Sequence, residues 1–195
     1  PAIISATTAD TDANGFLDTI ILNYSETIDS VKGNGNGYRL EDKDITTGTI
    51  LYQYVVNSAS VAGSTVTLGI AENDTQYDTG VLPYVFYQPG NGATLDGVDS
   101  PNNINEAHLQ EEFPVDDGAP PVMVEAETDD IDCNGFIDRI YITYSELISG
   151  LDDTDPDPIR FGYQVTGYTV NDAQVNLTDA LMPPALNTRP DVVTL

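Results

Sequence analysis

Two short acidic segments carry side chains whose types and spacing suit the binding of a hard cation. In the first segment, oxygen-bearing side chains stand at Asp10, Asp12, Asn14 and Asp18, and a glycine at the sixth position allows the chain to turn sharply. Such oxygens at the first, third, fifth and ninth positions of a tight loop can converge on one ion, and the seventh position, Phe16, offers its backbone carbonyl. The second segment repeats this arrangement 120 residues later, with the equivalent ligands Asp130, Asp132, Asn134, Phe136 and Asp138.

This spacing matches the first nine positions of the calcium loop of an EF-hand, so we expect each segment to bind Ca²⁺. The twelfth position departs from that pattern, because Ile21 and Tyr141 stand where a bidentate glutamate is required. The flanks also depart, since β-branched and aromatic residues follow both segments, whereas an EF-hand needs helices. We therefore expect each loop to join two strands and to take its closing ligand from elsewhere. A turn without metal is the alternative interpretation.

The acidic segments lie within a longer internal repeat. Pro1–Ser30 and Pro121–Gly150 are identical at 14 of 30 aligned positions, whereas roughly two identities are expected by chance. Such a repeat indicates an array of similar units. We predict two β-sandwich domains, 1–119 and 120–195, with the proline-containing segment Asp116–Pro121 as a short stiff linker. The first copy continues beyond the point that the second one reaches, so we predict that 120–195 lacks its final strand in this chain.

Short runs of alternating apolar and polar residues dominate the rest of the sequence and predict strands. In the run Thr19–Tyr24, the side chains of Ile20, Leu22 and Tyr24 share one face. Helical periodicity is nearly absent, so we predict an all-β fold of tandem immunoglobulin-like antiparallel β-sandwiches. The other predicted strands are Ile50–Val56, Ser64–Ile70, Val81–Tyr87, Ala107–Val115, Arg139–Tyr144, Tyr163–Val170 and Gln174–Leu177.

We expect the ligands that close the calcium sites to lie at the junction between the two domains. In an immunoglobulin-like sandwich, the loop between the first two strands lies at the end from which the chain leaves. Asp116 and Asp117 of the linker would then approach the loop Asp10–Asp18, and Glu146 of the next domain would face the same junction. Calcium at this place would stiffen the joint by neutralising crowded carboxylates. A solvated strand end is the alternative for Glu146.

Net charge limits the classes of partner. The chain of 195 residues has 32 acidic and 6 basic side chains and a formal charge of −26. This charge disfavours nucleic acid and anionic membranes, and it favours bound divalent cations or a salty medium. Surface acidity of the halophile type, without a specific site, is the alternative cause. The sequence has no apolar run long enough to span a membrane, and its single cysteine, Cys133, excludes an intrachain disulfide.

The acidic loop and the residues after it resemble the start of immunoglobulin-like repeats in large prokaryotic surface proteins, such as surface-layer proteins and adhesins. The triplets Tyr24-Ser25-Glu26 and Tyr144-Ser145-Glu146 resemble the end of the second strand in those repeats, and Val115–Pro120 resembles their linker. The resemblance implies an extracellular β-sandwich array that is often stabilised by calcium. It implies no catalytic residues.

These patterns favour a structural protein over an enzyme, because the only histidine, His108, has no identifiable nucleophile partner. We expect an extracellular or cell-surface repeat protein, as in a surface layer, adhesin stalk or filament, that contacts neighbouring repeats or copies of itself. One alternative is a carbohydrate- or partner-binding module of a secreted protein, with surface polysaccharide as a candidate ligand. Its candidate aromatic residues are Tyr52, Tyr54, Tyr84 and Tyr87. Another is the subunit of a self-assembling filament that is completed by a strand from a neighbour.

Overall fold

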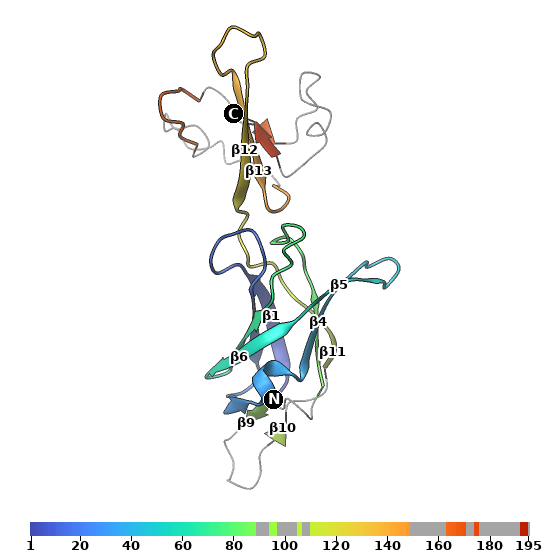
Figure 1. Ribbon diagram of the computed structural model, residues 1–195. Coiled ribbons are helices and arrows are strands. Elements are labelled where there is room, and N and C mark those ends of the chain that lie inside the picture. Colours follow the sequence, from blue (N-terminus) through green and yellow to red (C-terminus); the bar gives the residue numbers. More distant parts are fainter. Residues whose placement is uncertain are drawn as a thin grey trace. The chain divides into compact units, whose positions relative to one another are not determined.

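The computed structural model divides the chain into two compact units, Pro1–Pro120 (unit 1) and Pro121–Leu195 (unit 2). It describes residues 1–88, 94–96, 105–106, 110–148, 163–170, 174–175 and 192–194. Within these residues the fold is all-β, its sheets are antiparallel and it contains no α-helix (Figure 1). The same residues include no helix that is long and apolar enough to cross a membrane.

Unit 1 contains two four-stranded sheets and a smaller third one. The first sheet has the order β1 (Ile3–Ala9), β2 (Thr19–Tyr24), β7 (Thr65–Ile70), β6 (Val56–Ala62). The second has the order β11 (Gln110–Pro114), β8 (Tyr84–Tyr87), β4 (Tyr38–Lys43), β5 (Ile50–Tyr54). The third has the order β10 (Asn105–Glu106), β9 (Thr94–Asp96), β3 (Ser30–Val31), and the 3₁₀ turn η1 (Gly33–Gly35) leads from β3 towards β4.

The two large sheets of unit 1 share one hydrophobic core. Strand β2 buries Ile20, Leu22 and Tyr24, which confirms the face predicted from their alternation. Leu40 of β4 and Tyr87 of β8 belong to the same buried cluster, although they come from the other sheet. Complete burial of such a side chain contributes about 1.5–3 kcal/mol to folding. The alternating pattern therefore holds the two sheets face to face, as in a β-sandwich.

The segment after β11 lies along the free side of β1. Asp116 and Thr7 form a parallel bridge, in which the Asp116 N–H donates to the Ala6 carbonyl at 2.8 Å and the Thr8 N–H donates to the Asp116 carbonyl at 3.0 Å. The Gly118 N–H donates to the Thr8 hydroxyl at 3.0 Å. A β-carbon on Gly118 would clash with the Thr7 side chain and the Thr8 carbonyl oxygen. This close approach requires glycine, and it makes the first half of the predicted linker part of unit 1.

Unit 2 repeats the beginning of unit 1. Strands β12 (Met123–Asp129) and β13 (Arg139–Tyr144) pair as β1 and β2 do, with a register irregularity at the equivalent place near the start of the first strand. The Tyr144 hydroxyl lies 2.5 Å from the Tyr163 hydroxyl. In unit 1 the Tyr24 and Tyr38 hydroxyls are also 2.5 Å apart. The sheet of unit 2 has the order β12, β13, β15 (Val192–Thr194), β14 (Gln174–Val175).

Several strand predictions need correction. Tyr163–Val170 is not a strand, because the Tyr168 N–H donates to the Val165 carbonyl at 3.1 Å in a turn and Gly167 has a φ of 87°. The alternation of its side chains is real, but glycine lets the backbone reverse there. In unit 1, the predicted strand Ile50–Val56 covers parts of two strands, because β5 ends at Tyr54 and β6 of the other sheet begins at Val56. The prediction that unit 2 lacks its final strand falls on residues outside the described ranges.

Strand β4 holds a buried carboxylate between two cations on the face that points away from the core. The Glu41 side chain is 4% exposed, and its oxygens lie 2.8 Å from Arg39 Nε and 3.2 Å from Lys43 Nζ. Both cations also lie 4.3 Å from the centroid of the Phe86 ring. Lys43 contacts a second carboxylate, Glu112 of β11, whose side chain is 59% exposed. The two carboxylates therefore share one cation but differ in their contact with water.

Replacing Glu41 by glutamine should lower the free energy of unfolding by about 1–3 kcal/mol, because the buried charge that both cations face is lost. Glu112→Gln is the matched control. It removes an exposed partner of the same lysine and should have a much smaller effect. Urea unfolding of the two variants measures the difference, and equal losses would show that burial of Glu41 is not what stabilises this group.

Candidate metal centre

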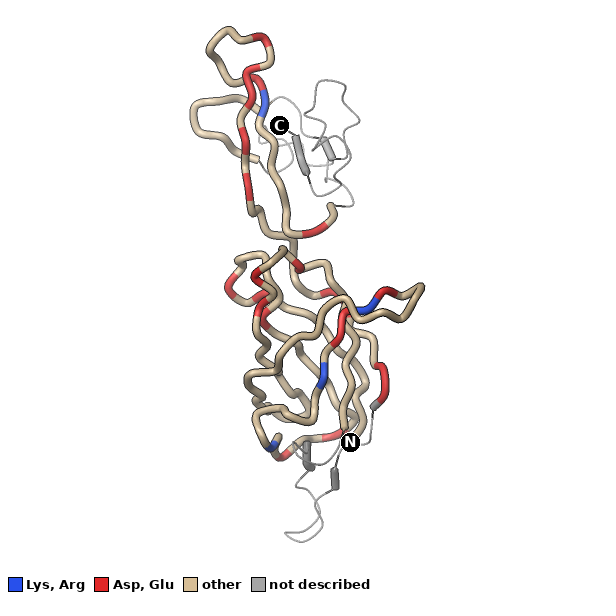
Figure 2. Tube along the Cα trace, turned by 45° about the vertical axis from the view of Figure 1, so that its right-hand side comes forward, with Lys and Arg blue, Asp and Glu red and all other residues tan. Residues whose placement is uncertain are grey.

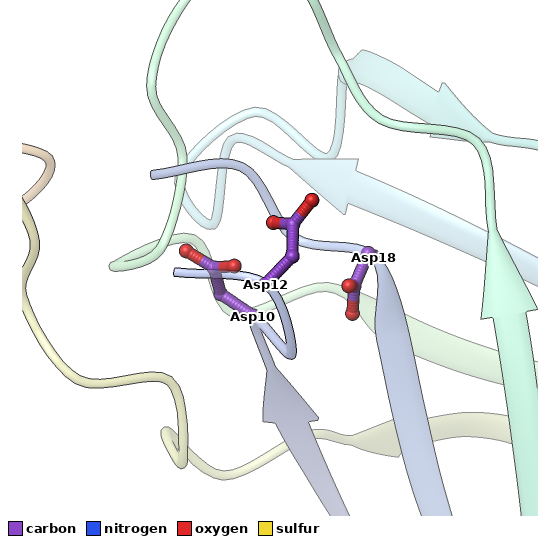
Figure 3. Close-up of side chains that lie close together, drawn as sticks. All are labelled: Asp10, Asp12 and Asp18. Atoms are coloured by element: carbon purple, nitrogen blue, oxygen red, sulfur yellow. The ribbon is translucent and has the colours of Figure 1, made fainter. Parts of the chain in front are cut away.

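The first acidic loop connects β1 to β2 and brings its carboxylates together. Asp10 follows the last residue of β1, and Asp18 precedes the first residue of β2. Asp10, Asp12 and Asp18 each have a carboxylate oxygen within 4.8 Å of the others, and Figure 3 shows the three side chains around the loop. The antiparallel pairing of β1 with β2 thus places both ends of the loop side by side.

Backbone hydrogen bonds to side chains give this loop its shape. The Asp10 carboxylate accepts from the Asn14 N–H at 3.3 Å and from the Gly15 N–H at 2.8 Å. Asn14 Oδ1 accepts from the Phe16 N–H at 2.9 Å. These are local bonds between a short polar side chain and the backbone that follows it, which explains why aspartate and asparagine occupy these positions.

The second acidic loop, between β12 and β13, has the same geometry. Asp130, Asp132 and Asp138 have carboxylate oxygens within 4.8 Å of one another. The Asp130 carboxylate accepts from the Asn134 N–H at 3.1 Å and from the Gly135 N–H at 2.8 Å, as Asp10 does in unit 1. The loop sequences therefore specify one local structure, which is built twice.

Each loop turns through two residues with positive φ. These are Ala13 (57°) and Gly15 (94°) in unit 1, and Cys133 (58°) and Gly135 (90°) in unit 2. Glycine adopts this conformation readily, whereas alanine and cysteine do so at a cost that the hydrogen bonds of the loop offset. Cys133 is exposed and takes the positive φ that Ala13 takes in the first loop.

The donor set of unit 1 fits a hard divalent cation. Asp18 Oδ1 is buried and has no hydrogen-bond partner within the described part of the chain, while Oδ2 accepts from the Thr11 N–H at 3.1 Å and from its hydroxyl. A buried carboxylate oxygen without a donor is costly unless a cation or a proton satisfies it. Asn14 Nδ2 lies 3.2 Å from an oxygen of Asp12 and 3.2 Å from one of Glu72. The side-chain oxygens here suit Ca²⁺ or Mg²⁺ better than zinc or copper.

A second segment, residues 71–83 between β7 and β8, holds the first loop against the core. Asp78 is 1% exposed, and its Oδ1 accepts from the Leu17 N–H at 2.7 Å. Asp78 Oδ2 accepts from the Tyr54 hydroxyl at 2.7 Å, and the Asp78 N–H donates to the Gly15 carbonyl at 3.1 Å. The Phe16 ring lies 4.9 Å from that of Tyr77. Sequence reasoning missed this segment and Glu72, because neither has a local pattern that ties it to the loop.

The remaining predicted ligands are not among the carboxylates that converge within the described residues. Asp116 and Asp117 are exposed, and Asp116 bridges Thr7 through its backbone. Glu146 is half-buried, two residues after β13 ends. Ligation by these three side chains, and by the carbonyls of Phe16 and Phe136, stays a prediction.

The tyrosines considered for ligand binding divide into two classes. Tyr54 and Tyr87 are buried in the core of unit 1 and present no surface to a ligand. Tyr52 and Tyr84 are half-buried. An aromatic platform made of all four side chains is therefore excluded.

Comparisons with protein-family models, with curated proteins and with solved structures found no match.

The environment of Asp78 favours the protonated form of its side chain. Burial raises the pKa of the Asp78 carboxyl, and the nearby charges of Glu72 and Asp10 raise it further, while the bonds from Leu17 and Tyr54 oppose the shift. An acid with a raised pKa in the folded state stabilises the fold below its unfolded pKa. It loses this contribution as pH rises through the folded pKa.

Asp78→Asn should therefore gain stability relative to the wild type as pH rises from acidic to neutral, with chelator present. Asparagine can keep both hydrogen bonds of Asp78 without the buried charge. Asp78→Ala is the control, and it should lose about 1–3 kcal/mol because the Leu17 N–H loses its acceptor. Thermal unfolding of the three proteins over this pH range measures both effects. A constant difference between wild type and Asp78→Asn would contradict the raised pKa.

Proposed function

We propose that this chain belongs to an extracellular or cell-surface structural protein built of tandem immunoglobulin-like β-sandwich repeats, which calcium stabilises at the acidic loops. One observation carries the proposal. The same loop, with three converging carboxylates, occurs at the equivalent place in both units. The repetition favours a structural role over catalysis, because an active site is expected once and needs distinct groups.

Asp10, Asp12, Asn14 and Asp18 would hold the ion in unit 1, together with the Phe16 carbonyl. Without a cation, the three carboxylates within 4.8 Å repel one another. A bound divalent cation supplies charge neutralisation and a ligand for the buried Asp18 Oδ1. Binding to the folded state alone stabilises it by RT ln(1 + [L]/Kd).

The loop connects to the rest of unit 1 through short contacts of its backbone and of the Asn14 side chain. Glu72 and Asn14 link the loop to the residues after β7, and Asp78 links it to Tyr54 of β5. The Ile70 N–H donates to the Asp18 carbonyl at 2.8 Å. An ion that orders Asp18 and Asn14 would therefore stabilise strands of both large sheets. We expect calcium to raise the stability of the whole unit and not only the order of its loop.

Millimolar calcium should raise the midpoint of thermal unfolding relative to excess chelator at fixed ionic strength. A site that is filled at about 100-fold its Kd contributes roughly 2.7 kcal/mol, which shifts the midpoint of a small domain by several degrees. The double variant Asp12→Ala, Asp132→Ala should lose this shift. Glu111→Ala, which removes an exposed carboxylate outside the loops, should keep it.

Magnesium at the same concentration serves as the control for ion type, because Mg²⁺ also prefers oxygen ligands but demands a near-ideal octahedron and gives up its water reluctantly, whereas Ca²⁺ accepts more ligands in a flexible loop. An equal rise with both ions, or an unchanged rise in the double variant, would assign the effect to general screening of the chain's negative charge.

A further inference from the structure

Unit 1 protects two of the four outer strands of its large sheets. Strand β1 is covered by the backbone of Asp116. Strand β11 carries Glu111, Glu112 and Pro114, and its pairing with β8 is irregular after Gln110. Charges, proline and irregular pairing are the usual means by which proteins keep a sheet edge from pairing with another chain.

The other two outer strands, β5 and β6, lack charge and proline, although each pairs irregularly with its neighbour at one point and β6 is also contacted by η1 and β3. They follow each other in sequence, and each has a hydrogen-bonded strand on one side only among the described residues. No residue from 45 to 71 is charged, and none is a proline. This stretch therefore lacks red and blue in Figure 2, although the chain as a whole carries a charge of −26.

The side chains along these two strands permit close approach. Leu51 of β5 is 63% exposed and Val55, between the strands, is 59% exposed. Ser60 and Ala62 of β6 are exposed and small, while Val61 between them turns towards the core. An edge of this kind offers unpaired backbone N–H and C=O groups beside apolar and small polar side chains.

We propose that the charge-free edge of unit 1, formed by β5 and β6, pairs with the same edge of a second copy of this chain. The distribution of charge favours this edge as the place where a second copy binds. Two copies of so acidic a chain repel each other over most of their surface, and the repulsion is smallest where neither carries charge. Every copy presents the same edge, so an antiparallel contact of β6 with β6 is self-complementary and closes as a symmetric dimer. Backbone hydrogen bonds then extend the sheet across both chains.

This contact responds to salt in the opposite way to an ion-paired one. Added salt screens the repulsion between the two acidic chains and leaves backbone hydrogen bonds and apolar contacts in place. Dimerisation should therefore strengthen as ionic strength rises. A dimer held by ion pairs, or by calcium bridging the acidic loops of two chains, would weaken with salt or dissociate in chelator. Dimerisation through this edge does not require calcium.

Sedimentation velocity of the whole chain tests the proposal over a wide range of concentration, at low and high salt, with calcium and with chelator. We expect a monomer–dimer equilibrium that strengthens with salt under both conditions. Ser60→Glu should weaken the dimer about tenfold or more, because each substitution counts twice in a symmetric contact. The matched control Gln88→Glu adds the same charge at an exposed position outside the edge and should leave dimerisation nearly unchanged.

Ala62→Glu, at another exposed position of β6, is the second variant, and circular dichroism of each variant checks that it folds. Hydrogen exchange of the dimer should show added protection of backbone amides in residues 56–62. A chain that stays monomeric at high salt would overturn the proposal. A dimer that Ser60→Glu and Gln88→Glu weaken equally, that needs calcium, or that protects other amides would overturn it as well.

Discussion

Carboxylates held close together where two paired strands meet set the main constraint on this protein. The pairing of β1 with β2 fixes the points at which Asp10 and Asp18 leave the sheet. Hydrogen bonds within the loop hold these side chains and that of Asp12 close together. Crowded charge is therefore a consequence of the fold, and the proposed cation would neutralise it at that place. In unit 2 the equivalent residues, Asp130, Asp132 and Asp138, are crowded in the same way.

The first loop is also a structural part of the core. Leu17 is fully buried in the hydrophobic cluster, one residue before the ligand candidate Asp18. Its N–H donates to Asp78, whose other oxygen accepts from a core tyrosine, Tyr54. The acidic loop and the hydrophobic core of the sandwich are thus connected through Leu17 and Asp78. This physical link allows ion binding to be coupled to the stability of unit 1.

Local features of the fold followed from the sequence. The loop from Asp10 to Asp18 is specified by short-range hydrogen bonds, and the buried face of β2 is specified by alternation, so both were predictable. Contacts that join distant segments were not. Nothing near Asp78 in the sequence ties it to Leu17. The topology that brings Asp116 towards the first loop does not specify its pairing with Thr7. The turn at Gly167 shows a third limit, because alternation alone does not reveal where glycine reverses the backbone.

Equilibrium dialysis of the intact chain against radioactive calcium tests most directly whether the two acidic loops are binding sites. We expect saturable binding of two ions per chain, one for each group of three carboxylates. Asp12→Ala and Asp132→Ala should each remove one of them. Binding that does not saturate, or a stoichiometry that neither substitution changes, would contradict calcium binding at the loops and would leave them as turns on an acidic surface.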